Sequence, residues 1–397
     1  MIDLVEAQAK AVALGRAPRA LMVHILDAVG CVLAEDVVTE GPVPPFANSA
    51  MDGYAVRAAD TASAPVELVV VDHVAAGAVS GRRVEAGTAM RVMTGAPIPD
   101  GADAIVMVER TIVRDSDPPT VLIEVAVEPG LFVRRAGSDL RGGAVVLSAG
   151  ETVRPAHAGL LAAAGRAEVL VYRPPLVGVL SSGDELIDPP QPLGPGQIRD
   201  ANRPALLATL RSEGIRTSDL GAVPDDEHAL DVALAAAAAS CDLVLTTGGV
   251  SMGDHDLIKT RLTPFQVAIK PAKPLAMGLI DGTPVIGLPG NPVSALVSYE
   301  LFARPLIRRL AGHGDDALFR PLVTARAAET MKRAPDGKLH LLRVIASHDE
   351  RGQLNVVEAG EQGSHVLSAM AAANALALVP DGEGVAAGDE VSVMLLR

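Results

Sequence analysis

The alternation of apolar and helix-forming segments between residues 173 and 320 most constrains the fold of this chain. The apolar segments are LVGVL, TSDLGAVP, CDLVLTT and TPVIGLPG, and the expected helices cover 203–213, 227–239, a stretch near 257–262, and 292–310. Strands that alternate with helices predict a parallel sheet covered on both faces. The expected fold class is therefore α/β, with a doubly wound parallel sheet at its centre.

The regions on either side of this segment have a different texture. Short Val-rich segments separated by Gly, Pro and Asp fill residues 54–139, and similar segments follow residue 320, so both regions are expected to be β-structured. Helical spacing of apolar residues predicts helices over 3–16 and 21–33, and an Ala-rich helix over 156–164. The chain should therefore fold into several domains.

Charge and composition exclude several classes of partner. The chain has 34 basic and 48 acidic residues, so its net charge of -14 argues against nucleic acid as the main ligand. The charge-free run 282–299 is interrupted by Pro284, Pro289 and Pro292, which argues against a membrane span. Two distant cysteines and a start without a signal peptide favour the cytoplasm.

The loop TTGGVSMGDHD follows the apolar strand CDLVL and carries the clearest chemical signal. It offers hydroxyls and close backbone approach, which suit a phosphate group, and its two carboxylates suit Mg²⁺. Two further loops, SSGDEL and PGNPVSAL, follow other strands, and ligands bind beyond the carboxyl ends of parallel strands. The three loops should share one site, with these candidates: Ser181, Ser182, Gly183, Thr246, Thr247, Gly248, Gly249, Ser251, Pro289, Gly290, Asn291 and Pro292.

Charged side chains near the same strand ends add a second signal. Glu185, Asp225 and Asp256 are candidate metal ligands, although Asp225 lies in an acidic trio that also suits capping of the following helix. Lys270 and Lys273 in IKPAKP form a locally basic hook that suits an oxyanion, or else lie solvated at a strand edge. The loops of the β-rich region contain four further candidates: Asp52, Thr94, Arg134 and Asp139. Turn formation alone could also explain each of these residues.

One motif supports a different enzyme class. Gly249–Gly253 reads G-x-S-x-G between a strand and a helix, which is typical of the nucleophile elbow of serine hydrolases with Ser251 as nucleophile. Such an enzyme also needs a histidine base, and no local pattern selects one among His313, His340, His348 and His365. The serine hydrolase is the alternative enzymatic hypothesis.

Taken together, the motifs resemble the MoeA-type molybdopterin molybdenumtransferase family, to which the E domain of gephyrin-like proteins also belongs. The matching strings occur in the expected order between residues 48 and 302: NSAMDGYAV, MTGAPIPDGADAIVMVE, RRAGSDLRGG, VGVLSSGDEL, TTGGVSMGDHD, IKPAKPLAMG and GLPGNPVSALVSYELF. Each string alone is weakly specific, whereas their ordered set is highly specific.

The resemblance implies an architecture of four parts: an elongated N-terminal domain (1–45 with 140–172), an inserted β domain (46–139), a molybdopterin-binding α/β domain (173–320) and a C-terminal β-barrel-like domain (321–397). It also implies an elongated homodimer with its active cleft on the α/β domain near the dimer interface. Transient partners would be a molybdopterin adenylyltransferase upstream and molybdoenzymes downstream. Among relatives, a non-catalytic molybdopterin-binding scaffold is a further alternative.

The implied reaction is Mg²⁺-dependent insertion of molybdate into adenylylated molybdopterin, which releases AMP and yields the molybdenum cofactor. By motif, the resemblance places Glu185, Asp256, Asp52, Asp139 and Lys273 at catalytic positions. It places Thr94, Arg134 and Lys270 among the substrate-binding residues, and Glu185, Asp225 and Asp256 at the metal. His255 occupies a position in the GDHD loop where the family commonly has other residues.

Overall fold

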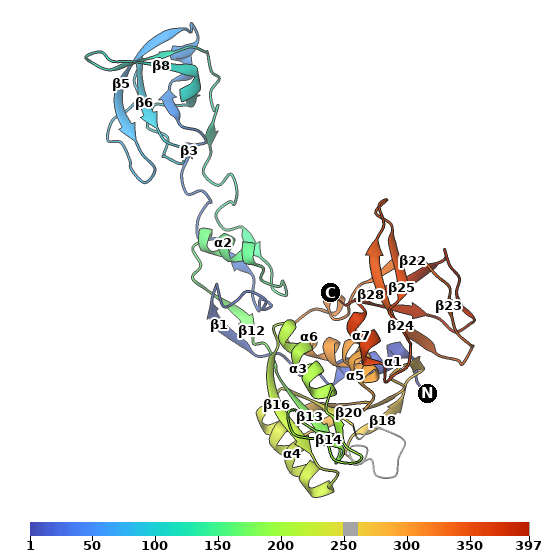
Figure 1. Cartoon of the computed structure of the whole chain (residues 1–397). Helices are drawn as coiled ribbons and strands as arrows, with labels where there is room; N and C mark the ends of the chain where they lie inside the picture. The colour runs from blue at the N-terminus through green and yellow to red at the C-terminus, as the bar shows by residue number, and fades with distance from the viewer. Residues whose placement is uncertain (249–260, 397) are drawn as a thin grey trace.

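The computed structural model describes residues 1–248 and 261–396 of the chain. The molecule is elongated (Figure 1): a β domain at one end is joined by a narrow middle part to an α/β domain, against which a C-terminal β domain packs. The chain runs out to the far β domain and returns, so the narrow middle part contains two segments distant in sequence. Within the described residues the molecule has three six-stranded sheets, one each in the far β domain, the α/β domain and the C-terminal β domain.

A six-stranded sheet forms the centre of the α/β domain, in the order β16-β13-β17-β21-β20-β18. The first four strands are mutually parallel, as the sequence predicts. Strands β13, β17 and β21 are buried on both faces, whereas β16 is a partly exposed edge strand. The strands span β13 Leu176–Ser182, β16 Arg216–Val223, β17 Leu243–Thr247, β18 Thr263–Gln266, β20 Pro274–Ile280 and β21 Thr283–Leu288. The sheet is thus mostly, but not wholly, parallel.

The antiparallel edge was not predicted from the sequence. Strand β20 pairs with β21 through the tight turn at Asp281 and Gly282, both at positive φ, and β18 pairs antiparallel with β20. A tight turn of this kind joins neighbouring strands as a hairpin, with no room for a crossover helix. The helix expected near 257–262 lies almost wholly outside the described residues.

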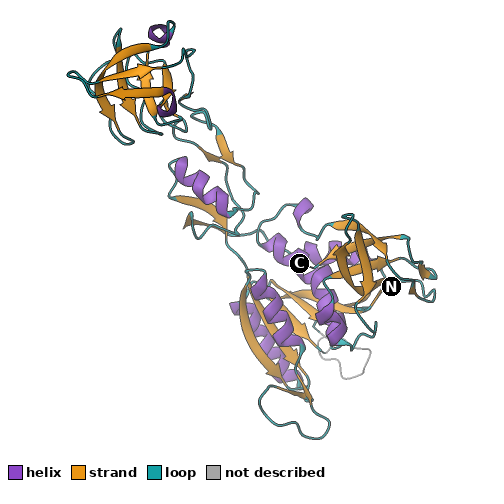
Figure 2. Ribbon diagram, turned by 45° about the horizontal axis from the view of Figure 1, so that its top comes forward, coloured by secondary structure: helices purple, strands orange, loops and turns teal. Residues whose placement is uncertain are grey.

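Helices cover both faces of the sheet (Figure 2), which gives the expected doubly wound arrangement. Helix α3 (Asn202–Ser212) and α5 (Pro292–Ser298) pack together on one face, and α4 (Glu227–Ser240) contacts β16, β17 and β21 on the other. Asp226 caps α4 by accepting a hydrogen bond from the N–H of Ala229 at 2.8 Å, which supports the capping interpretation of the acidic trio. These helices match the predicted positions closely.

The expected helix 292–310 is present but contains one wide turn. A π-helical turn, η4 (Tyr299–Ala303), joins α5 to α6 (Arg304–Leu310). The N-terminal helix α1 (Leu4–Ala13) packs against α6 and η4, so the first residues of the chain lie on the α/β domain. Pro305 falls directly after the wide turn, where it lacks the N–H that a regular helix would use.

The predicted helix at 21–33 is wrong. Residues Ala20–His24 form strand β1, which pairs antiparallel with β12 (Glu168–Tyr172), and turns follow it as far as Gly30. Gly30 has a φ of 89°, which a helix interior does not accommodate. Pairing with a distant strand therefore overrides the local helical spacing. Helix α2 (Pro155–Ala163) agrees with the predicted Ala-rich helix.

The far β domain is a six-stranded sheet in the order β7-β4-β6-β5-β9-β8. Its strands span β4 Gly53–Val56, β5 Val66–Val74, β6 Thr88–Val92, β7 Ala104–Met107, β8 Thr111–Arg114 and β9 Thr120–Ile123. The short ladders β2 Val37–Val38 with β11 Val145–Leu147, and β3 Asn48–Ser49 with β10 Val133–Arg134, connect it to the middle part. The predicted all-β character of this region is confirmed.

Five strands of the C-terminal domain close into a barrel, since β24 pairs with both β25 and β26. The strands are β22 Leu322–Ala327, β24 Leu339–His348, β25 Leu354–Glu358, β26 Ala375–Val379 and β28 Glu390–Leu395, and the short helix α7 covers Leu367–Ala372. Leu341, Leu376 and Met394 of the barrel share one apolar core with the α/β domain. The barrel is therefore packed firmly on the α/β domain.

A partly buried carboxylate ties the narrow middle part to the α/β domain. Asp242 accepts hydrogen bonds from Arg16 and Arg173, each at 2.6 Å, and from the N–H of Leu176 at 2.9 Å. Arg16 lies on the outgoing segment and Arg173 on the returning one, so a single side chain holds both. Across residues 1–248 and 261–396, no helix is long and apolar enough to cross a bilayer.

Candidate functional site

A cleft of about 350 Å³ opens where three parallel strands end. Ser182 ends β13 and Glu185 follows it, Thr247 ends β17 and Gly248 follows it, and the loop 289–291 follows β21. The expectation that these three loops share one mouth is met, because β13, β17 and β21 are consecutive and parallel in the sheet. Leu186, Ile198, Asn202 and Pro274 complete the lining.

Hydroxyl groups and one buried carboxylate lie beneath the cleft. Ser181 Oγ donates to Asp200 Oδ2 at 2.6 Å and lies 3.2 Å from Thr247 Oγ1. All three residues are buried, and such groups must be hydrogen-bonded to each other because water cannot reach them. This series of hydrogen bonds fixes the orientation of the Thr247 side chain, and Thr247 lines the cleft.

Asp200 is held in turn by a buried arginine. Arg203 donates from Nε to Asp200 Oδ2 at 3.0 Å and from another nitrogen to Asp219 at 2.6 Å, and it also pairs with Asp188. Burial by itself lowers the pKa of Arg203, but the hydrogen bonds to Asp219, Asp188 and Asp200 outweigh it and raise the pKa overall. The guanidinium is therefore a permanent charge that anchors the start of α3 below the cleft.

Two glycines let the backbone approach closely at the cleft. Gly248 has a φ of 86°, and a Cβ placed there would lie 2.5 Å from the carbonyl oxygen of Ser182. At Gly183, with a φ of 144°, a Cβ would lie 2.3 Å from Glu185 Oε2. The positive φ favours glycine at both positions, and at Gly248 the neighbouring carbonyl also excludes a side chain, so the loop after β17 is in direct backbone contact with the end of β13.

The acidic candidates near the cleft are only partly brought together. Glu185 is exposed at the cleft and folds back over Gly183. The N–H of Asp225, in the loop after β16, donates to Asp184 Oδ1 in the loop after β13 at 3.2 Å. Within the described residues, no group of three His, Cys, Asp or Glu is placed to hold a metal ion. Asp256 lies outside the described residues, so the metal ligands Glu185, Asp225 and Asp256 stay a prediction.

The two lysines lie beside the cleft and next to the barrel. Lys270 belongs to β19 (Ile269–Lys270), which pairs in parallel with β24, and Lys273 lies just before Pro274 of the cleft. Both lysines are exposed. The hook therefore lies where the α/β domain and the barrel meet.

In the far β domain, Asp52 and Thr94 form one hydrogen-bonded unit. Asp52 Oδ1 accepts from the backbone N–H of Thr94 at 2.6 Å and from its hydroxyl at 2.8 Å. These two hydrogen bonds, with a smaller contribution from Arg91, lower the pKa of Asp52. Arg134 is exposed opposite Asn48 in the β3–β10 ladder, and Asp139 is exposed in the following loop.

The structure thus separates the predicted site residues into two groups. One group surrounds the cleft on the α/β domain, and Asp52, Thr94, Arg134 and Asp139 lie in or near the β domain at the other end of the elongated molecule (Figure 1). Within one chain the two groups do not meet. Gly249 and Ser251 lie outside the described residues, as does the whole G-x-S-x-G motif of the expected nucleophile elbow.

Sequence reasoning missed three residues of the cleft region. Asp200, Asn202 and Arg203 lie in IRDANRP, at the start of α3, and Asn202 Nδ2 donates to the carbonyl oxygen of Gly290 at 2.7 Å. The signal available in the sequence was a cluster of polar residues directly before a helix with an apolar face. That pattern was interpreted only as a helix start.

Family models match nearly the whole chain in three consecutive pieces. They are the MoeA N-terminal region (domain I and II) at residues 2–165, a probable molybdopterin binding domain at 178–309, and the MoeA C-terminal region (domain IV) at 324–396. The chain belongs to the MoeA family. The pieces follow the order of the strings quoted above, from the far β domain to the barrel.

Full-length relatives agree with this family assignment. A molybdopterin molybdenumtransferase 2 of Mycobacterium tuberculosis is 40% identical over 395 residues, which cover 95% of each chain. The molybdopterin molybdenumtransferase of Haemophilus influenzae is 38% identical over 377 residues, with 93% of this chain and 92% of that protein covered. The family is therefore one of molybdenum cofactor biosynthesis, and its members are transferases.

A solved structure of the family has the same overall fold. The molybdopterin biosynthesis moeA protein from Pyrococcus horikoshii OT3 superimposes with a TM-score of 0.82 at 31% identity, with all of both chains covered. The mostly parallel central sheet and the C-terminal barrel are thus features of the family. Membership favours the transferase over the serine hydrolase as the enzyme class for this chain.

Proposed function

We propose that this chain catalyses the molybdenumtransferase reaction: insertion of molybdate into adenylylated molybdopterin, with release of AMP. The observation that carries the proposal is the cleft at the ends of β13, β17 and β21, with its hydroxyls and close-approach glycines. An adenylylated pterin contains a phosphoanhydride, and bare backbone N–H groups beside hydroxyls are suited to bind it. Family membership supplies the identity of the pterin.

The cleft residues act by binding and orienting the phosphoanhydride. The Ser181–Asp200–Arg203 network holds Thr247 in place before substrate arrives, so less binding energy is lost in ordering the site. Gly248 lets the backbone of the β17 loop approach the phosphates, and Asn202 fixes Gly290 on the opposite side. The preorganised dipoles would stabilise negative charge that develops as the anhydride bond breaks.

Mg²⁺ fits the exposed oxygen donors near the cleft. Glu185 and Asp225 offer carboxylates, and Mg²⁺ needs only one or two of them because it keeps waters and binds substrate phosphates. When bound, the ion would withdraw charge from the phosphate oxygens. Asp256 would be a third ligand, contributed from the segment outside the described residues.

Lys270 and Lys273 are proposed to bind molybdate or the pterin phosphate. Both lysines are exposed near Pro274 of the cleft lining, and they form a locally basic pair in a protein of net charge -14. A lysine ammonium is a compact point charge that attracts an oxyanion without imposing a planar geometry. This position would bring the oxyanion to the edge of the cleft.

We further propose that a homodimer completes the site. Asp52, Thr94 and Arg134 lie at the far end of the molecule from the cleft, and a twofold dimer would place the β domain of one copy beside the cleft of the other. The exposed, strongly hydrogen-bonded Asp52 carboxylate would then face substrate across the interface. Each dimer would have two such composite sites.

The test is AMP release from adenylylated molybdopterin by the purified protein with Mg²⁺, with and without molybdate. We expect molybdate-dependent release and formation of the molybdenum cofactor. Glu185→Gln keeps the side-chain volume but removes the charge, and should lower turnover by at least about 100-fold. Glu227→Gln, which changes an exposed acid at the start of α4, is the matched control and should leave turnover intact.

Two results would contradict the proposal. Absence of release by the unmodified protein would argue against transferase activity in this chain, and full turnover by Glu185→Gln would remove Glu185 from the mechanism. Release that does not depend on molybdate would instead point to a hydrolase acting on the same anhydride.

A further inference from the structure

A second cavity lies at the other end of α3 from the cleft. It has a volume of about 450 Å³ and lies between the narrow middle part and the α/β domain. The middle part contributes Cys31 and Tyr172 to the lining, and the α/β domain contributes Arg304, Arg308 and His313. It shares no lining residue with the cleft. Helix α3 has 11 residues, so the two sites are separated by roughly 15 Å along its axis.

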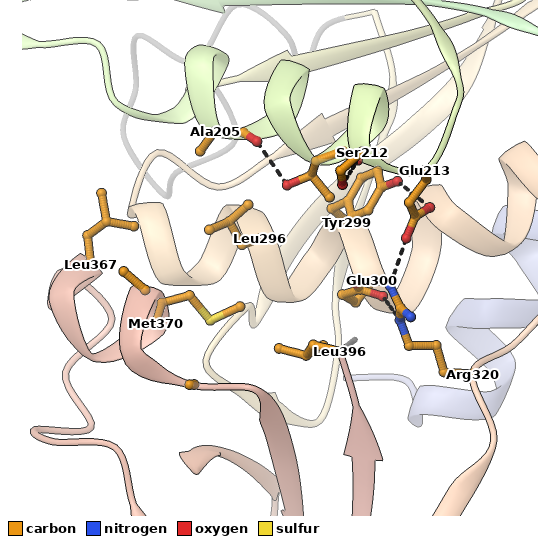
Figure 3. Close-up of a pocket in the computed structure, with 13 residues that line it drawn as sticks. Ala205, Ser212, Glu213, Leu296, Tyr299, Glu300, Arg320, Leu367, Met370 and Leu396 are labelled. Atoms are coloured by element: carbon orange, nitrogen blue, oxygen red, sulfur yellow. Dashed lines mark hydrogen bonds and ion pairs between the residues drawn. The ribbon is translucent and has the colours of Figure 1, made fainter. Parts of the chain in front are cut away.

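A cluster of paired charges lies beside this cavity, which Glu213 and Arg320 of the cluster line. Figure 3 shows the same cluster from a neighbouring pocket, which these two residues also line. Arg320 donates to Glu213 at 2.7 Å and to Glu300 at 2.7 Å, and the hydroxyl of Tyr299 donates to Glu213 at 3.1 Å. Burial, followed by the charges of Glu213 and Glu300, raises the pKa of Tyr299, so it stays a donor. The two carboxylates are therefore already engaged by neighbours.

Arg304 belongs to the same cluster but is only partly satisfied. Its Nε donates to Glu213 at 3.1 Å, and its Nη1 is buried without a hydrogen-bond partner. A buried donor on a charged group that lacks an acceptor is costly, because water no longer solvates it.

Arg308 is the arginine for which this cluster has no carboxylate. Within the described residues its contacts are the carbonyl oxygen of Ala317 and, at 3.3 Å, the ring nitrogen Nδ1 of His313, and no salt bridge joins it to an acid. Burial and the charge of Arg304 lower its pKa, and the charge of Glu213 offsets only part of this. The guanidinium of Arg308 is therefore half-buried close to the positive charges of Arg304 and Arg320.

The charges around the cavity do not balance. Arg304, Arg308 and Arg320 carry three positive charges, whereas Glu213 and Glu300 carry two negative ones. Burial, followed by the nearby arginines, lowers the pKa of His313 to about 4, so the imidazole is neutral at pH 7 and adds no charge. One unit of positive charge remains, and it is located at Arg308.

We propose that this cavity binds a small oxyanion of the phosphate class, held by Arg308, the lining arginine that has no carboxylate partner in this cluster. A planar guanidinium matches the spacing of two phosphate oxygens, and such charge-assisted bonds are the strong ones. The site is distinct from the catalytic cleft and does not depend on the proposed reaction. A free phosphate ion and the phosphate of a nucleotide both offer the required group.

Cys31 provides a local reporter, because it lines the cavity and is one of only two cysteines. The alkylation rate of Cys31 by iodoacetamide would be followed by mass spectrometry while inorganic phosphate is added, with potassium chloride at equal ionic strength as the comparison. An anion beside the thiol occludes it and disfavours the thiolate that reacts. We expect phosphate, but not chloride, to slow alkylation of Cys31, and the buried Cys241 to stay unchanged.

Variants then assign the effect to the cavity. Arg308→Gln should weaken protection of Cys31 by at least about tenfold in phosphate concentration, since a hydrogen-bonded charge is lost. Arg309→Gln is the matched control, because the neighbouring Arg309 pairs with the exposed Asp315 instead of facing this cavity. It should retain protection. Separate titrations with AMP and with inorganic phosphate show whether the nucleotide phosphate or the free ion binds more tightly.

Two outcomes would overturn the proposal. Alkylation of Cys31 that phosphate and AMP leave unchanged in the unmodified protein would exclude binding in the cavity, whatever the variants do. Protection that persists in Arg308→Gln would place the anion elsewhere. Should Arg308→Gln fail to fold, Arg308→Lys keeps the charge without the planar fork, and undiminished protection in that variant would exclude recognition by the guanidinium.

Discussion

At the scale of single residues, buried polar side chains control the shape of the cleft. Asp200 accepts hydrogen bonds from Ser181 and from the backbone and side chain of Arg203, although it does not itself line the cleft. Its role is therefore positional, and it links the end of β13 to the start of α3. A carboxylate in such a place stabilises the structure only while every partner is present.

Asp200→Asn is expected to destabilise the α/β domain by about 3 kcal/mol, because Arg203 would keep a buried charge with one partner lost. That corresponds to a decrease of roughly 6–12 °C in the Tm of the domain transition, measured by calorimetry. Asp219→Asn removes a partner of the same arginine that is much more exposed. It is the control, and an equal loss in both variants would contradict a special role for Asp200.

The Asp52–Thr94 pair leads to a prediction about protonation. Since hydrogen bonds from Thr94 hold the pKa of Asp52 below its ordinary value of 3.8, Thr94→Val should raise that pKa toward 3.8. The pair stabilises the folded state above the ordinary pKa, and this contribution is lost as the pH falls through the lowered value.

The titration of carboxyl carbons by NMR measures this change. Asp72 in the same domain also has a lowered pKa, through hydrogen bonds from Ser80 and the N–H of His73, and serves as an internal control. An unchanged Asp52 titration in Thr94→Val would show that the threonine hydroxyl is not what lowers the pKa. A parallel change at Asp72 would indicate a global perturbation.

At the scale of elements, strand β17 and the loop after it bring the backbone close to the neighbouring strand. Gly248 lies directly after Thr247, and the space where its Cβ would project is filled by the carbonyl of Ser182 at the end of β13. The contact exists because β13 and β17 are paired in parallel and end at the same level. The cleft thus depends on strand register as well as on loop sequence.

Gly248→Ala should lower AMP release by about 100-fold, because relief of the clash moves the phosphate-binding backbone by roughly 1 Å. Gly282→Ala is the control: Gly282 also has positive φ, but its Cβ would meet no atom within 4 Å. That variant should lose only about 1 kcal/mol of stability and keep its turnover. Equal turnover in the two variants would contradict a role for close approach at Gly248.

At the scale of the whole molecule, the elongated shape separates two groups of candidate residues. Both connecting segments are held at the α/β domain by Asp242, through Arg16 and Arg173. The far β domain is therefore carried by a linked pair of segments, and not by a single flexible linker. Such an arm suits a protein that presents Asp52 and Thr94 to a second copy of itself.

Mixed dimers test this arrangement. In a mixture of Glu185→Ala and Asp52→Ala chains, random pairing should restore about a quarter of the unmodified turnover if each site combines the cleft of one copy with the β domain of the other, as twofold symmetry requires. Each variant alone is expected to be inactive, and AMP release by co-purified chains is the measurement. A mixture as inactive as its components would contradict the composite site.

Local patterns in the sequence were sufficient for most elements and for the family. The alternation of strands and helices predicted the parallel strands β13, β16, β17 and β21, because each helix between them has its own apolar face and its own start. The loops after these strands were correctly expected to share one cleft, since parallel strands bring their carboxyl ends to one edge.

Other features depended on contacts between distant residues, so tertiary structure alone decided them. Residues 21–33 have helical spacing, yet pairing of β1 with β12 made Ala20–His24 a strand. The buried Asp200–Arg203 pair became visible only when α3 was placed against β13 and β16. The sequence by itself determined most of the elements, the family and the chemistry of the loops, because those follow from short-range patterns. Tertiary structure decided which polar groups are buried together and how far Asp52 lies from the cleft, because both depend on how the chain returns upon itself.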